Sequence, residues 1–265
     1  MSSVLADPWR RLAVYTPARV GLGRAGTGLP TREVLSFALA HAQARDAVHF
    51  PLDVQALATA ITNLDLHCVV VDSAATSRDL YLRRPDLGRR LAPQSRAALS
   101  SPATPIDVAL VVTDGLSSAA VHAHVMPFIV AFRPYAKGAG WQLSPVIIAR
   151  EGRVALGDEI GEILKARVVL MLIGERPGLS SPDSLGLYLT FAPRVGRTDA
   201  ERNCISNIRS GGLLPTHAAA KAAWLAGESL RRRLSGVDLK DDSELVLIEP
   251  AAVPPSLRNP QAENA

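Results

Sequence analysis

The sequence predicts an α/β protein: a Rossmann-like, mostly parallel sheet with helices on both faces, preceded by a mainly helical N-terminal region. Apolar runs at 106–112, 146–149 and 168–173 have no polar alternation, which is typical of strands buried on both faces. Helical patterns alternate with these runs, as the crossover connections of a parallel sheet require. With 265 residues, 48% of them apolar, the chain can bury a full core.

The predicted helices place apolar residues on one face at spacings of three and four. The first begins near Thr31, a capping residue type, with Glu33 in its first turn. Two helices are predicted to begin near Thr31 and near Ser117. Three more are predicted over residues 54–63, 159–165 and 216–234. Shorter apolar or β-branched runs predict further strands at 69–71, 185–191 and 245–248.

These patterns divide the chain into four regions. Residues 1–30 are rich in Pro, Gly and Arg and predict an arm that becomes ordered against something else. Residues 31–100 form a mainly helical region, 101–235 an α/β domain, and 236–265 a proline-containing C-terminal tail.

Composition argues against several function classes. The net charge of +4 is small for this length and does not predict a nucleic-acid binder, although basic stretches occur at 83–90 and 231–233. Two cysteines are too few for a disulfide framework, which favours a reducing compartment. The apolar run 168–173 is far shorter than the ~18 residues of a membrane span. We therefore expect a cytoplasmic protein without membrane or nucleic-acid partners.

A formal GxGxxG motif occupies 21–26. In a dinucleotide fold this motif follows a strand and opens a helix, because the pyrophosphate sits on the helix N-terminus. Pro17 interrupts the segment before the motif, and Gly28 and Pro30 prevent an immediate helix after it. The motif therefore does not predict a nicotinamide or flavin site.

Polar loops follow the first and third long strands, where ligands of open α/β sheets bind. Asp114 and Ser117 follow the first strand, and helix capping explains them as well as ligand binding does. Glu175 lies in the loop 174–184, which alone could be a rigid surface turn. Because parallel strands end at one edge, we expect Asp114 and Glu175 to lie side by side. No GxSxG motif is present, so a serine hydrolase is not indicated.

A third polar segment, 197–208, contains Cys204. This cysteine could be a packed small hydrophobe, a reactive thiol or a ligand contact. No Cys/His spacing typical of a metal site occurs, and we expect no metal ligand in the chain.

Six ordered blocks carry a family resemblance. They are GRAGT at 23–27, RPDLGRRL at 84–91, VTDGLSS at 112–118, GDEIGEIL at 157–164, GERPGLSSPDSLG at 174–186 and RTDAERNCISNIR at 197–209. Together they resemble the small, or light, subunit of ethanolamine ammonia-lyase. Blocks of this length are far more specific than a lone GxGxxG.

The resemblance implies a subunit of an adenosylcobalamin-dependent lyase that converts ethanolamine to acetaldehyde and ammonia. In this family a large barrel subunit holds the substrate above the corrin ring, and the small subunit closes the cofactor from its other side. The family's cofactor contacts match Val154, in a predicted hairpin, together with Glu175 and Cys204. No catalytic residue is expected here, because the cofactor supplies the difficult step. The region 101–235 would then be the cobalamin-contacting domain.

Two points of the family pattern bear on this chain. It has no Asp-x-His-x-x-Gly segment, so the cofactor is expected to keep its own base as lower ligand, with His122 and His124 as ordinary helix residues. The longest family members carry an extra N-terminal arm linked to a bacterial microcompartment, and packaging of this chain in one stays open. The alternatives are a nucleotide-binding α/β oxidoreductase and a non-catalytic scaffold.

Overall fold

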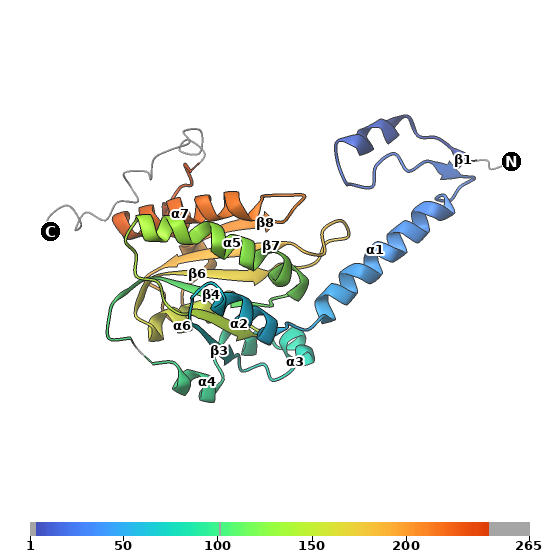
Figure 1. Ribbon diagram of the computed structural model, residues 1–265. Coiled ribbons are helices and arrows are strands. Elements are labelled where there is room, and N and C mark those ends of the chain that lie inside the picture. Colours follow the sequence, from blue (N-terminus) through green and yellow to red (C-terminus); the bar gives the residue numbers. More distant parts are fainter. Residues whose placement is uncertain (1–3, 101, 244–265) are drawn as a thin grey trace.

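A computed structural model describes residues 4–100 and 102–243. Its central sheet has the order β3-β5-β4-β6-β7-β8 (Figure 1). The strands are β3 (Cys68–Asp72), β4 (Ile106–Thr113), β5 (Val146–Arg150), β6 (Ala166–Gly174), β7 (Leu185–Phe191) and β8 (Arg202–Ile208). The first four are parallel, and β7 runs antiparallel to both of its neighbours. The predicted fold class is confirmed.

The two-residue repeat of the strands produces two separate cores. Leu110 and Val112 of β4 point to one face of the sheet, where α2 (Val54–Thr62), α5 (Ser118–Gly138) and α7 (Pro215–Arg232) pack. Ala109 and Val111 point to the opposite face, where α6 (Leu156–Ile163) packs. Because both faces of the parallel strands are buried, their sequences are continuous apolar runs.

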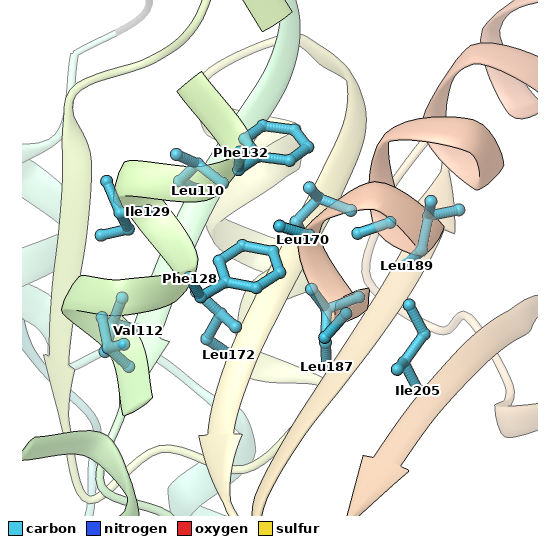
Figure 2. Close-up of a cluster of buried hydrophobic side chains, with 14 of the residues drawn as sticks. Leu110, Val112, Phe128, Ile129, Phe132, Leu170, Leu172, Leu187, Leu189 and Ile205 are labelled. Atoms are coloured by element: carbon cyan, nitrogen blue, oxygen red, sulfur yellow. The ribbon is translucent and has the colours of Figure 1, made fainter. Parts of the chain in front are cut away.

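The face beneath α5 and α7 is closed by tightly packed apolar side chains (Figure 2). Phe128 and Phe132 of α5 are fully buried, and their ring centroids lie 5.7 Å apart. They pack over Leu170 of β6 and Leu187 of β7. The buried alanines of α7 allow that helix to lie close to the sheet beside them.

The N-terminal segment extends away from the sheet (Figure 1). It contains an antiparallel pair, β1 (Val4–Leu5) with β2 (Arg24–Ala25), a 3-10 helix η1 (Pro8–Val14), and the 19-residue helix α1 (Thr31–His49). The buried residues of α1 are Ala40, Ala44 and Ala47. Further along, β3 adds a strand to the main sheet from within the predicted mainly helical region. The division into four regions stays a prediction.

Short helices complete the described chain: α3 (Arg78–Arg83), η2 (Leu87–Arg89), α4 (Pro93–Ala98), η3 (Asp199–Glu201) and η4 (Gly236–Asp238). Helix α6 begins at Leu156, before the predicted start at Glu159. The sequence did not indicate β8, because it is a polar edge strand with only every third side chain buried. The predicted strand at 245–248 lies outside the described residues. None of the described helices has the length and apolar character to cross a membrane.

Candidate functional site

The loops that follow β4 and β6 lie side by side, as predicted. The Leu116 amide donates to the Gly174 carbonyl at 2.8 Å. Ser117 Oγ donates to the Pro182 carbonyl at 2.8 Å and also caps α5. Gly115 has a φ of +55°, and a Cβ atom there would lie 2.3 Å from the Gly174 oxygen. The loops at the carboxyl ends of β4 and β6 are therefore joined into one surface.

Glu175 begins the loop after β6, and its carboxylate is held from two sides. Ser184 Oγ donates to Oε2 at 2.5 Å, and the Asn207 amide donates to the same oxygen at 3.2 Å. The side chain lies over Gly186 of β7, where an added Cβ would be 2.9 Å from Oε1. Oε1 accepts no hydrogen bond from the described residues and is therefore available to a ligand donor.

Cys204 of β8 stands opposite Tyr188 of β7, so both side chains point to the same face of the sheet. Cys204 is exposed, yet protein atoms crowd its thiol, and this partial burial raises the pKa of Cys204, with Glu175 adding to the effect. Burial also raises the pKa of Tyr188 to about 12. Both groups are protonated at neutral pH, which makes Cys204 a polarisable contact rather than a thiolate nucleophile.

Val154 does not lie in a hairpin, which corrects the sequence prediction. It lies in the turn between β5 and α6, because β5 continues into a crossover helix instead of an antiparallel neighbour. Val154 is half-buried and lines a cleft of about 880 Å³. Arg202 lines the same cleft and lies two positions before Cys204 on the same face of β8. The cleft therefore borders the surface that carries Cys204.

A buried ion pair joins the start of α6, next to Val154, to strand β8, which carries Cys204. Arg202 donates to both carboxylate oxygens of Asp158 in α6, at 2.5 and 2.6 Å, and also to Thr190 Oγ1 at 3.0 Å. Both charged side chains are 2% exposed. A bidentate pair of this kind fixes orientation as well as distance. It therefore holds the start of α6, and with it the turn of Val154, against β8.

The crevice between the ends of β4 and β5 is where an open α/β sheet usually binds a nucleotide. Here Arg78 fills it: Nη1 lies 2.8 Å from Glu151 Oε2, 2.8 Å from the Gly115 oxygen and 3.6 Å from Asp114 Oδ2. Burial raises the pKa of Asp114 to about 6, Glu151 adds to this increase, and Arg78 opposes it. The chain's own side chains thus occupy the expected ligand position.

The GxGxxG segment is not built as a dinucleotide site. Between the two-residue β1, which ends at Leu5, and Gly21 the described chain has only the 3-10 helix η1, and the two-residue β2 lies inside the motif. The next helix begins only at Thr31, after Pro30. This segment also lies in the projecting arm, away from the sheet (Figure 1).

Comparison with known proteins decides the family. The family model described as ethanolamine ammonia-lyase light chain matches residues 6–240. The chain belongs to this family. A relative from Xanthomonas campestris pv. campestris, named ethanolamine ammonia-lyase small subunit, is 54% identical over 246 residues, covering 91% of this chain and 90% of the relative. A relative of the same name from Pseudomonas putida is 53% identical over 247 residues, covering 92% and 91%. The resemblance of the six sequence blocks is confirmed.

For this light chain, sequence reasoning did not indicate three residues of the surface: Tyr188, Asp158 and Arg202. A signal for Tyr188 was present, because Leu185, Leu187 and Leu189 alternate with it and mark a strand with two different faces. No sequence signal joins Asp158 to Arg202, since their contact depends on how α6 packs.

The two histidines of α5 contact other residues of the chain. His122 accepts a hydrogen bond from the Asp53 amide at 3.0 Å, and His124 Nε2 lies 3.4 Å from Asp183 Oδ2.

Proposed function

We propose that this light chain closes the cofactor site of an adenosylcobalamin-dependent ethanolamine ammonia-lyase, together with a large subunit. The reaction would convert ethanolamine to acetaldehyde and ammonia. The observation that carries the proposal is the open face of β7 and β8, which presents Glu175, Tyr188 and Cys204 together. Helix α6 reaches only the border of this face, through the Asp158–Arg202 ion pair and the core against which Tyr188 packs, whereas α7 covers the opposite face of both strands.

The chemistry of this face fits a corrin. Amide groups on the corrin rim offer N–H donors, and Glu175 Oε1 has an unused acceptor. A hydrogen bond to a charged acceptor contributes roughly 1.5 to 3 kcal/mol. Cys204 and Tyr188 supply a neutral, polarisable surface beside it, and Val154 would give a steric or backbone contact from the cleft side.

When bound, adenosylcobalamin supplies the radical chemistry. The residues of this chain would bind and orient the cofactor and keep water from its face. Since the carboxylates nearest the usual ligand crevice are engaged by Arg78, we assign the substrate site to the large subunit.

Exposed apolar side chains support a protein partner. Leu35 is 64% exposed, Leu39 61% and Phe37 49%, all on the projecting helix α1. Leu35 and Leu39 lie one turn apart on the same side of the helix and Phe37 lies on another side, so several sides of α1 expose apolar surface that a partner could cover. The name small subunit, printed for the relatives, agrees with a larger partner.

The test separates the chain from its partner. Each subunit is purified alone and after coexpression, and acetaldehyde release from ethanolamine is measured with adenosylcobalamin. We expect activity only for the mixture, and a visible corrin spectrum that stays with the complex in gel filtration. Activity of this chain alone would contradict the proposal. A complex without corrin affinity would favour the non-catalytic scaffold instead.

A nucleotide-dependent oxidoreductase has less support. Its motif at 21–26 lacks the required strand and helix, and Arg78 fills the crevice at the sheet edge. Retention of a nicotinamide or flavin by the purified chain would reverse this assignment.

A further inference from the structure

We infer that the cleft beside Val154 is an anion site for the phosphodiester of the cofactor's nucleotide tail, with Arg89, Arg90 and Arg153 as its ligands. This inference rests on the proposed function and adds residues beyond the three cofactor contacts. Arg89 and Arg90 belong to the RPDLGRRL block, to which the site described above assigns no role.

The charges that line the cleft do not balance. Six arginines face four carboxylates there. The lining residues are Arg89, Arg90, Arg96, Arg153, Arg197 and Arg202, with Asp86, Asp158, Glu159 and Asp199.

Each of the four carboxylates already has a partner. Asp86 pairs with Arg84 outside the lining at 2.8 Å, and Glu159 pairs with Arg96 at 2.6 Å. Asp158 and Asp199 both pair with Arg202.

Three arginines of the cleft therefore have no ion-pair partner among the described residues, although Asp86 partly offsets the charge of Arg90 at longer range. Arg197 pairs with Glu201, outside the lining. Within residues 4–100 and 102–243, no carboxylate lies within ion-pair distance of Arg89, Arg90 or Arg153. A local excess of unpaired guanidinium groups in a concave surface attracts an anion.

Arg153 is held in place before any ligand binds. Its amide donates to the Gly88 carbonyl at 2.7 Å, and its guanidinium lies 4.2 Å from the centre of the Tyr81 ring. Nη2 donates to the Tyr81 carbonyl at 3.1 Å. Its buried Nε has no acceptor in the described chain. The side chain is therefore preorganised, with donor capacity left over.

The hydrogen bond from the Arg153 amide to the Gly88 carbonyl also places Arg153 next to Arg89 and Arg90. Because the Arg153 amide binds the residue before Arg89, the turn that carries Val154 and the segment 88–90 lie against one another. Arg89 and Arg90 are exposed and can reach an incoming group.

A phosphodiester suits this arrangement. Guanidinium groups match phosphate oxygens with paired hydrogen bonds, and several can share one phosphate. Cobalamin carries a single phosphodiester in its nucleotide tail. Val154, the neighbour of Arg153 in the chain, is itself a proposed cofactor contact and lines the same cleft. A ligand that touches Val154 can therefore place its phosphate beside Arg153.

The experiment compares two truncated corrins that differ by the phosphate. Adenosylcobinamide phosphate and adenosylcobinamide are titrated onto the intact two-subunit complex, and binding is followed by equilibrium dialysis with corrin absorption. We expect the wild type to prefer the phosphate form by about tenfold to a hundredfold. The Arg89→Gln/Arg90→Gln double variant, and Arg153→Gln separately, should lose most of this preference while keeping the affinity for adenosylcobinamide.

A matched control removes two positive charges elsewhere. Arg232→Gln/Arg233→Gln, at the exposed end of α7, should leave the preference unchanged. Because Arg153 packs on a buried ring, the exposed double variant keeps the test valid if Arg153→Gln folds poorly. Inorganic phosphate at matched concentrations should not displace adenosylcobinamide phosphate, and displacement would assign the cleft to free phosphate instead.

The outcomes separate this inference from the proposed function. If the complex binds cobalamin but both arginine variants keep the wild-type preference, the anion site is overturned and the proposed function stands. Loss of the large subunit from the variants in size exclusion would assign the arginines to a partner carboxylate and would also overturn the anion site. A complex that binds no corrin would overturn the proposed function and this inference with it.

Discussion

The two faces of the sheet differ in what covers them. Beneath α5 and α7, the side chains of β4, β6, β7 and β8 are buried in one apolar core. On the other face α6 covers the parallel strands and the core beneath it reaches Tyr188 of β7, whereas Gly186 and Cys204 lie beyond that core and Cys204 is exposed. Strands β7 and β8 therefore each take part in both environments.

The difference shows how a single strand can serve stability and binding at once. Leu185, Leu187 and Leu189 of β7 are 0% exposed and contribute to the core, while the residues between them face outward to Glu175 and Cys204. Because successive side chains point to opposite faces, the polar face can vary without opening the core. We therefore expect substitutions on the two faces to have separable effects.

The largest expected effect is on the closed face. Phe128→Ala should lower the free energy of unfolding by about 3 to 5 kcal/mol, because it leaves a cavity in a fully packed core. Tyr188→Ala on the open face should cost about half as much, since the ring is already partly exposed. Urea unfolding of both variants measures the difference. Equal costs would show that the open face is as tightly packed as the closed one.

The crevice between the ends of β4 and β5 predicts a pH dependence of the free energy of unfolding. Burial raises the pKa of Asp114 to about 6, so the folded state binds more protons than the unfolded state between about pH 4 and 6. The free energy of unfolding should therefore fall as pH rises through this range, and asparagine, which mimics the protonated form, should not show that fall.

This effect is measured as the difference between Asp114→Asn and the wild type. The difference in unfolding free energy, variant minus wild type, should rise by about 2 to 4 kcal/mol from pH 4 to pH 7. Asp79→Asn, which also replaces one carboxylate by an amide but at an exposed position of α3, is the matched control. A flat difference for Asp114→Asn would show that Arg78 keeps the carboxylate charged throughout.

On the open face, Glu175→Ala should affect the cofactor more than the fold. We expect it to raise the cobalamin concentration for half-maximal activity by about one to two powers of ten, at about 1.4 kcal/mol for each. Size exclusion should still show an intact complex. Unchanged cofactor dependence would remove Glu175 from the site and leave its loop as a turn or subunit contact.

The smallest effect is expected for Cys204→Ser. The hydroxyl keeps the size and polarity of the thiol but loses the soft sulfur contact, so the cofactor dependence should change less than about threefold. The same titration measures it, beside Cys68→Ser on β3 as a cysteine control away from the open face. A larger shift for Cys204→Ser than for Glu175→Ala would make sulfur the main contact.

The parallel part of the sheet could be predicted from the sequence because its strands are apolar throughout. The neighbouring ends of β4 and β6 followed from that topology, and Asp114 and Glu175 lie at this shared edge. The edge strand β8 could not be predicted, since Arg202 occupies a buried position that is normally apolar, and its partner Asp158 is distant in sequence. Val154 was assigned to the wrong kind of turn, because a short polar connection after a strand resembles a hairpin as well as a crossover.

The missing side chain of Gly186 matters for the position of Glu175 rather than for the backbone of β7. A methyl group at this position would lie 2.9 Å from Glu175 Oε1 and 3.1 Å from its Cγ, close enough to push the carboxylate aside. The chain could accommodate alanine in an extended strand, so the fold itself does not require glycine there. The absence of a side chain at position 186 thus determines where a negative charge stands. A change of one carbon atom there would alter the ligand surface without replacing any residue that touches the ligand.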